Sequence, residues 1–474
     1  MNLIDTLAQR ITAGPSIDAM ESAAQTLSVH VLDTVGAWIA GRATTEGRLL
    51  NGLRGDPAAG HAPFDSSMLD TVGLFTATAR LTEVDDIHMA SCTTPGALVV
   101  LIALTLAANM PRGWQSQERF AEAVHVGYEV MTGLGEAVSG PKILHQGVWP
   151  SLLLAPVTAA AVTAKLLNLD SEHTAHALAI ALTSSNGRPG GNASAGVASV
   201  RGTSARWLLF GMAARSGCAA AMSAAAGFTG DRGLLENDQA SPMRGLTLSH
   251  ERIASILQGP PAILRASIKP YCAAKHNIAA MFGFRQLLDQ GIAHEALTAV
   301  RVRLPPTHAK MVAHYDVEIS RLSRVTSCAY NLALVGVMPD DLLDVERAKA
   351  HRGVEMTRLA GKVDVVADEQ LQAATPQAYP AVVELLIGDR IIASETIIHA
   401  WGDPQRSFQI DEARQKFRRL SRGLLEPSTA LEIENLCLEV PNSAHARASV
   451  WNHLAGIDRR ESERDSLQLT HLRN

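Results

Sequence analysis

The chain has 474 residues, with 42 Lys and Arg against 47 Asp and Glu and a formal net charge of −5. This balance excludes a general attraction to nucleic acid or to an anionic membrane, so any anion must be bound at local cationic sites. The length predicts two or three domains, or one large helical domain with an insertion. The cysteines, Cys92, Cys218, Cys272, Cys328 and Cys437, form no CxxC pair, which indicates neither a zinc site nor a disulfide framework and fits a reducing cytoplasm.

The first part of the chain is expected to be a mostly helical body. The N-terminus lacks the basic and apolar regions of a secretory signal and should form the first helix. The segment 97–108 is apolar but shorter than the roughly 20 residues that span a bilayer, so no membrane segment is predicted. Small residues and helical periodicity predict close-packed helices in 22–39, 117–137, 153–169 and 204–226.

The pattern changes after Pro260, where strands are predicted as well as helices. Residues 298–304 alternate apolar and polar side chains, and 381–387 and 391–398 are typical of a hairpin that turns at Gly388-Asp389. Helical patterns return in 411–424 and 429–436. The predicted fold is therefore mainly α, with a large all-α domain of residues 1–267 completed by 402–474, and a smaller α/β lid domain of residues 268–401.

A cluster of acidic residues and a histidine precedes the apolar segment 97–108. Asp85, Asp86 and His88 lie within four positions of one another, shortly before Thr94-Pro95-Gly96. Charged groups beside a buried element are costly unless they are paired or take part in chemistry. Two interpretations stay open: the cluster is an acid/base group, or it caps the following helix, because Asp and Thr are common at helix starts.

Cationic residues gather where the chain is expected to enter the α/β domain. Lys269, Lys275 and His276 lie within Lys-Pro-Tyr-Cys-Ala-Ala-Lys-His, and Arg206 opens a predicted helix. Removing a proton next to a carboxylate requires a base, and cations that neutralise the developing charge. Arginine binds a carboxylate with two parallel hydrogen bonds, whereas lysine acts as a point charge, so Arg206 suits binding. For each cation the alternative is an ordinary surface charge, and for His276 it is a structural interface histidine.

Other motifs favour structural roles. The glycine-rich segment 186–192 lacks the lysine of a nucleotide-binding P-loop, so a loop is predicted there. His173 and His176 have the spacing of a metal pair but are expected on a solvated helix face. The basic stretch 414–419 has no run of interleaved aromatic residues, which argues against nucleic-acid binding.

Short motifs are spread in order along nearly the whole chain. They are Glu-Val-Asp-Asp-Ile-His at 83–88, Gly-Tyr-Glu-Val at 127–130, Ala-Lys-Leu-Leu-Asn-Leu at 164–169, Ala-Ala-Arg-Ser-Gly at 213–217, Gly-Phe-Thr-Gly at 227–230, Lys-Pro-Tyr at 269–271, Tyr-Pro-Ala-Val-Val at 379–383, Gly-Asp-Pro at 402–404 and Lys-Phe at 416–417. In this order of motifs the chain resembles the MmgE/PrpD family, which includes 2-methylcitrate dehydratase, cis-aconitate decarboxylase and iminodisuccinate epimerase. The resemblance implies an all-α domain with an α/β lid, a homodimer, no metal or organic cofactor, and proton abstraction from small di- or tricarboxylates.

The resemblance also shows where this chain departs from the family pattern. Thr94 and Trp149 each stand where a histidine is usual, Arg206 stands for the usual lysine, and Leu209 stands for a further histidine. His145 could supply an imidazole from a position close to Trp149. By resemblance, the candidate catalytic residues are Asp85, Asp86, His88 and His276, and the candidate substrate-binding residues are Thr94, His145, Trp149, Arg206, Lys269, Tyr271 and Lys275.

Two hypotheses for function follow. The first is a cofactor-independent enzyme that abstracts a proton next to a carboxylate and dehydrates, decarboxylates or epimerises its substrate. The second is a catalytically degenerate relative that binds a carboxylate or serves as a partner subunit. The substituted positions favour the second hypothesis, whereas the retained acidic motif and His276 favour the first.

Overall fold

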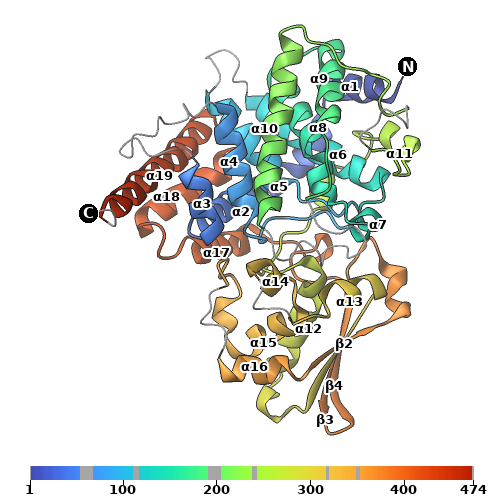
Figure 1. The fold of residues 1–474 in the computed structure, drawn as a ribbon, viewed down its shortest axis with the longest axis vertical. Helices are drawn as coiled ribbons and strands as arrows, with labels where there is room; N and C mark the ends of the chain where they lie inside the picture. Colours follow the sequence, from blue (N-terminus) through green and yellow to red (C-terminus); the bar gives the residue numbers. More distant parts are fainter. Residues whose placement is uncertain are drawn as a thin grey trace.

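The computed structural model describes residues 2–53, 68–109, 117–189, 204–236, 243–315, 320–347 and 353–471. Figure 1 shows a large helical part above a smaller part that contains the sheet. The helices of the larger part are α1 (Leu3–Ala13), α2 (Ile17–Arg42), α3 (Thr45–Gly52), α4 (Met68–Arg80), α5 (Gly96–Asn109), α6 (Gln117–Ala137), α7 (Gly140–His145), α8 (Pro150–Leu166), α9 (Ser171–Thr183), α10 (Ala205–Ala225), α11 (His250–Ala254), α17 (Ile410–Ser421), α18 (Pro427–Glu439) and α19 (Ala444–His471).

Local sequence explains where several of these helices begin. Asn2, Ser16 and Asp170 each accept a hydrogen bond from a backbone N–H in the first turn of α1, α2 and α9. α1 ends at Gly14, which adopts a positive φ of 77° and donates its N–H to the Arg10 carbonyl. These caps satisfy backbone groups that would otherwise lack partners at helix ends.

Small residues allow the central helices to approach closely, as the sequence predicts. A Cβ atom added at Gly211 in α10 would lie 2.2 Å from the Gly73 carbonyl oxygen in α4. A Cβ atom at Gly217 would lie 2.1 Å from the Pro156 carbonyl oxygen in α8. No side chain fits at these distances, so larger residues would force α10 away from both neighbours.

The hydrophobic core of the helical part combines residues from both ends of the chain. Most of its residues lie between Ile4 and Ile268 or between Phe408 and Ile457, and Cys272, Val325, Leu343 and Val345 join it from the intervening segment. The C-terminal helices α17 and α18 pack against α2, and α19 packs against α5. One described helix, α10, is long and apolar enough to cross a membrane, a test that a core helix of a soluble protein also passes. Here α10 packs against α4, α8 and α9 within a globular fold.

The smaller part has its own hydrophobic core, built from residues between Tyr271 and Ala400. Its strands form a four-stranded sheet in the order β2-β1-β3-β4. β1 pairs with β2 in parallel and with β3 antiparallel, and β3 and β4 form an antiparallel hairpin. The elements are α12 (Lys275–Leu288), β1 (Ala299–Leu304), α13 (Pro306–Val312), α14 (Arg321–Thr326), α15 (Cys328–Val337), α16 (Val354–Ala360), β2 (Val363–Ala367), β3 (Ala381–Ile387) and β4 (Arg390–Ile397).

The mainly helical fold with a small mixed sheet is confirmed. The predicted hairpin forms with its turn at Gly388-Asp389, and the predicted strand at 298–304 is β1. β2 was not predicted, because its sequence Val-Asp-Val-Val-Ala is short and mostly exposed. The helix predicted over 153–169 begins earlier, at Pro150, and ends at Leu166. Of the predicted loop 186–192, residues 190–192 lie outside the described residues. The domain boundaries and the role of the α/β part as a lid stay predictions.

Two chain segments that connect the parts lie side by side. The Ile268 N–H donates to the Gly402 carbonyl over 2.9 Å. Gly402 has a φ of 90°, and a Cβ atom there would lie 2.0 Å from the Ile268 carbonyl oxygen. Asp403 forms a buried ion pair with Lys275 and accepts a 3.0 Å hydrogen bond from Ser267 Oγ. These contacts fix the junction at which Lys269 and His276 enter the site.

Candidate functional site

The loop between α4 and α5 carries the acidic motif. Its backbone adopts a positive φ at Glu83 (59°) and at Cys92 (54°), which non-glycine residues rarely do. An antiparallel bridge joins His88 to Thr93, and a second bridge joins Ile87 to Ser267. The loop is therefore held against the segment that leads into the α/β part.

Asp86 is 2% exposed and has a structural set of partners. Its carboxylate accepts hydrogen bonds from the Gly96 N–H at 2.8 Å and from Tyr128 Oη at 2.6 Å, and it lies 3.0 Å from His30 Nδ1. Burial alone would raise the pKa of Asp86, but the contacts with His30 and Tyr128 hold it below its usual range. Asp86 therefore anchors the start of α5, as the capping interpretation predicts.

Asp85 belongs to a second buried network, formed by ion pairs, and lines neither described cavity. Its carboxylate lies 3.0 Å from an Arg80 nitrogen and 3.6 Å from Lys269 Nζ, and the side chain is fully enclosed. Burial raises the pKa of Asp85 to about 6, against the lowering effect of Arg80 and Lys269. Glu83 lies 3.1 Å from Arg80, and its pKa falls to about 2 because the attraction of Arg80 and Lys269 outweighs burial.

Within the described parts of the chain, Arg206 has no ion-pair partner. It is 8% exposed, and none of the described carboxylates lies within ion-pair distance of it, although Glu83 attracts it from farther away. Its guanidinium stacks on the Trp149 ring with its carbon 4.2 Å from the ring centroid, and Arg80 lies 5.2 Å from the same ring. The buried Arg206 Nε has no hydrogen-bond partner among the described residues. Burial lowers the pKa of Arg206 to about 10, so it stays charged near neutral pH.

A small inner chamber of about 70 Å³ is lined by Arg80, Glu83, Trp149, Arg206 and Lys269. A chamber of this size holds roughly one or two water molecules or a carboxylate group. Lys275 also lines it, but its ammonium is paired with Asp403. Thr94 lines it too, with its N–H donating to Ser151 Oγ over 3.1 Å. The polar lining is Arg80, Glu83, Thr94, Arg206, Lys269, Lys275, His276 and Thr326.

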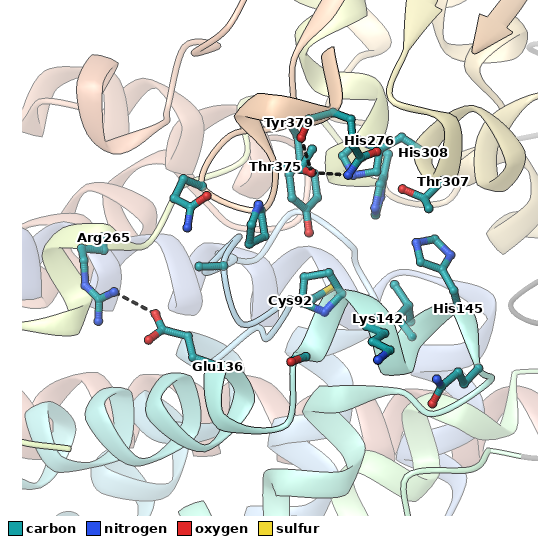
Figure 2. Close-up of a pocket in the computed structure, with 18 residues that line it drawn as sticks. Cys92, Glu136, Lys142, His145, Arg265, His276, Thr307, His308, Thr375 and Tyr379 are labelled. Atoms are coloured by element: carbon teal, nitrogen blue, oxygen red, sulfur yellow. Dashed lines mark hydrogen bonds and ion pairs between the residues drawn. The ribbon is translucent and has the colours of Figure 1, made fainter. Parts of the chain in front are cut away.

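A larger outer cavity of about 870 Å³ adjoins the chamber, and Cys92, Leu144 and His276 line both. Figure 2 shows the rings of Tyr379, His276 and His308 on one wall, with Lys142 and His145 facing them from the other. The size falls within the range of pockets that bury small-molecule ligands. His276 therefore stands at the junction of the two spaces.

The side chains around His276 keep it neutral. Its ring centroid lies 4.6 Å from that of His308 and 4.8 Å from that of Tyr379. Burial and the neighbouring His308 and His145 place the pKa of His276 well below its ordinary value. An unprotonated imidazole can accept a proton, so His276 has the form that a general base needs.

His88 is close to the outer cavity but does not line it. Its Nδ1 lies 2.9 Å from Ser91 Oγ and its Nε2 lies 3.6 Å from Glu136. Glu136 and Arg265, which pair at 2.8 Å, do line the cavity, as Figure 2 shows. Burial lowers the pKa of His88 to about 4, with a further contribution from Arg265. His88 thus lies behind the wall that Glu136 and Arg265 form.

The predicted site residues fall into three groups: those that line the inner chamber, those that line the outer cavity, and those that line neither. Asp85, Asp86, His88 and Tyr271 line neither described cavity, and Tyr271 belongs to the core of the α/β part. The inner chamber brings together Thr94, Trp149, Arg206, Lys269, Lys275 and His276, and the outer cavity adds His145.

Sequence reasoning missed several lining residues. Tyr379 could have been predicted, because it lies within the family motif at 379–383. Arg80 and Cys92 lie close to the acidic motif, but His308 and Arg265 have no pattern around them that suggests a site. Among the described residues, no group of three or more His, Cys, Asp or Glu side chains is placed to hold a metal ion.

Two family models match the chain. The MmgE/PrpD N-terminal domain matches residues 5–242, and the MmgE/PrpD C-terminal domain matches residues 271–440. The chain belongs to the MmgE/PrpD family. No curated protein sequence matches it. Members of this family are generally lyases and isomerases, so membership suggests dehydratase-type activity on carboxylates. The cationic inner chamber of this MmgE/PrpD protein agrees with a carboxylate ligand.

Buried neutral histidines should make this protein sensitive to mild acid. His125 in α6 is 2% exposed, its Nε2 has no partner among the described residues, and burial lowers its pKa to about 4. The unfolded chain binds a proton at this position below pH 6.5 while the folded chain does not, so stability is complete above pH 6.5 and falls as the pH drops toward 4. At pH 5.5 this histidine alone should cost about 1.4 kcal/mol relative to pH 7.5.

The measurement is urea unfolding at pH 7.5 and 5.5 for the wild type and for His125→Phe. Because the raised pKa of Asp85 acts in the opposite direction, the quantity to compare is the difference between the two proteins. The variant should lose about 1.4 kcal/mol less stability than the wild type between these pH values. An identical loss in both proteins would show that His125 takes up a proton as readily in the folded protein as in the unfolded chain.

Proposed function

We propose that this protein is a cofactor-independent enzyme that abstracts a proton next to a carboxylate of a small di- or tricarboxylate, leading to dehydration, decarboxylation or epimerisation. The observation that carries the proposal is the buried Arg206, which lines the inner chamber together with Lys269 and has no ion-pair partner among the described residues. An isolated buried charge is costly, and a ligand carboxylate would supply the missing partner.

The positions of the groups support an order of events. One substrate carboxylate enters the inner chamber and lies against Arg206 and Lys269. The adjacent carbon then lies at the junction, beside His276. His276 takes a proton from that carbon, and the C–H electron pair moves toward the carboxylate to give an enediolate. Arg206 and Lys269 stabilise the added negative charge.

We further propose that the α/β part acts as a lid, that residues 268–401 form it, and that the protein is a cytoplasmic homodimer. His276, His308 and Tyr379 all come from the α/β part, whereas Arg206 and Arg80 come from the helical part. A substrate bound by both sets of groups would therefore bridge the two parts and favour their closure. Light scattering of the purified protein measures the oligomeric state.

The test of the proposed reaction is proton NMR in D2O with purified protein and a panel of methylcitrate, cis-aconitate, citrate and iminodisuccinate. Deuterium incorporation at carbon, or net conversion, of any acid is the expected result. The product of a net conversion would also identify whether dehydration, decarboxylation or epimerisation follows proton abstraction. Complete inertness of every acid, with normal folding, would contradict the proposal.

The second candidate function is carboxylate binding without turnover. It is favoured by the inner chamber, where Thr94 bonds to Ser151 and the Trp149 ring contacts the guanidinium groups of Arg206 and Arg80. Neither Thr94 nor Trp149 therefore offers an ionisable group for proton transfer. A carboxylate that raises the melting temperature but exchanges no proton would support this candidate.

A further inference from the structure

His308 in α13 lines the outer cavity together with His145 and His276. Neither the motifs nor the family match gives His308 a role. It is 4% exposed, and its ring meets that of His276 edge-on, with an interplanar angle of 87° and centroids 4.6 Å apart. The Tyr379 ring packs against both, at 4.4 Å from His308. Figure 2 shows the three rings together on one wall. Burying two imidazoles side by side calls for a reason, since each prefers water or a hydrogen-bond partner.

The two histidines present the same atoms to the cavity. Nδ1 of His276 and Nδ1 of His308 are both buried without a hydrogen-bond partner among the described residues. The Nε2 atoms are therefore the ones left to meet a ligand. Tyr379 does not serve either of them as a donor, because its hydroxyl donates to the Met89 carbonyl over 3.2 Å.

The groups whose charges act on the pair are cationic or neutral, and Glu136, the carboxylate of the outer cavity, is paired with Arg265. Lys275 and Lys269 face His276 from the inner chamber, and His145 faces both imidazoles from the helical part. Burial lowers the pKa of His308 to about 3, so both rings are neutral before substrate binds. Two imidazolium ions at this separation would repel each other strongly, so the pair can take up one proton but not two.

We propose that His308 is a second acid/base residue of this site and that it works with His276 as one unit holding a single proton. The inference rests on the proposed function and assigns the step that follows proton abstraction. His276 Nε2 takes the proton from carbon, and the C–H electrons enter the enediolate. The same proton then passes from His276 Nε2 to His308 Nε2, and His308 gives it to the departing group or back to carbon. Both rings end neutral, and no other donor is consumed.

A double-mutant cycle tests this assignment. The variants are His276→Asn, His308→Asn and the double variant, assayed for deuterium incorporation or conversion with the acid that the wild type accepts. Each single variant should lose about 10²- to 10⁴-fold in rate, the usual contribution of a positioned acid/base group. Because residues that act as a unit are non-additive, the double variant should be no more than a few-fold slower than either single variant.

Two controls separate chemistry from packing. His308→Phe keeps an aromatic ring against His276 and Tyr379 but has no acid/base nitrogen, so it should lose as much rate as His308→Asn. His294→Gln alters a histidine of the same part that lines neither cavity and should keep the wild-type rate. The rise in melting temperature that the acid causes should persist in every variant, because Arg206 and Lys269 bind it.

A wild-type rate in His308→Phe would overturn the assignment and leave the proposed function standing. If the fold-losses in rate of the two single variants multiply in the double variant, the two histidines act independently, because independent groups give additive free energies. This result would overturn the proposal that they share one proton. A wild type that exchanges no proton with any acid would overturn the proposed function, and this inference with it.

Discussion

Replacing Arg206 by methionine should make the free protein more stable and weaken its affinity for a carboxylate. The substitution deletes a buried charge for which the described residues supply no ion-pair partner, while the thioether can still pack on the Trp149 ring. The free energy of unfolding should rise by about 1 kcal/mol or more, the gain typical of relieving a functional strain. Carboxylate affinity should fall by about 10- to 100-fold, as expected when a charged hydrogen bond of about 1.5–3 kcal/mol is lost.

Thermal unfolding with and without tricarboxylate, together with calorimetric titration, measures both effects. Arg80→Met is the matched control, because Arg80 stacks on the same ring but is paired with Glu83 and Asp85. This control should lose about 3–5 kcal/mol of stability, since it leaves two buried carboxylates with fewer partners. A less stable Arg206→Met variant would show that Arg206 has a structural partner in the folded protein.

Replacing Asp86 by alanine should mainly destabilise the fold. The change leaves Tyr128 Oη, the Gly96 N–H and His30 without the carboxylate that all three contact. A loss of about 3–5 kcal/mol is expected for removing one member of a buried charged network. Urea unfolding measures the loss, and the carboxylate affinity of the fraction that remains folded should be unchanged.

The comparison with His88→Ala distinguishes a structural carboxylate from a reacting one. His88 has fewer partners, so its removal should cost less stability than Asp86→Ala. An Asp86→Ala protein with wild-type stability and no proton exchange would contradict the structural role and return Asp86 to the reaction.

The sequence predicted the helices and the hairpin well because their signals are local. Helical periodicity marks 117–137, which is α6, and the Gly388-Asp389 turn marks the hairpin of β3 and β4. The exposed strand β2 was not predicted, because it forms by parallel pairing with β1, and the paired residues lie about sixty positions apart in the chain. Such pairing depends on the partner strand and leaves a weak pattern in the sequence itself.

The site was predicted in its charge types but not in its geometry. The acidic motif drew attention to Asp85, Asp86 and His88, yet all three face into the protein behind the cavities. Sequence spacing shows that charged groups are close along the chain, but it cannot show which of them faces a cavity. Arg206 was predicted as a binding residue from its chemistry, and the structure adds that no described carboxylate pairs with it.

The sequence by itself determined the family, the mainly helical fold and the absence of a strong overall charge, because these depend on composition, periodicity and ordered motifs. The tertiary structure decided which groups meet. It brought His308 beside His276, placed Arg206 on the Trp149 ring, and enclosed Asp86 among hydrogen-bond donors. These juxtapositions join residues far apart in the chain, and burial and neighbouring charges then set the protonation of each group.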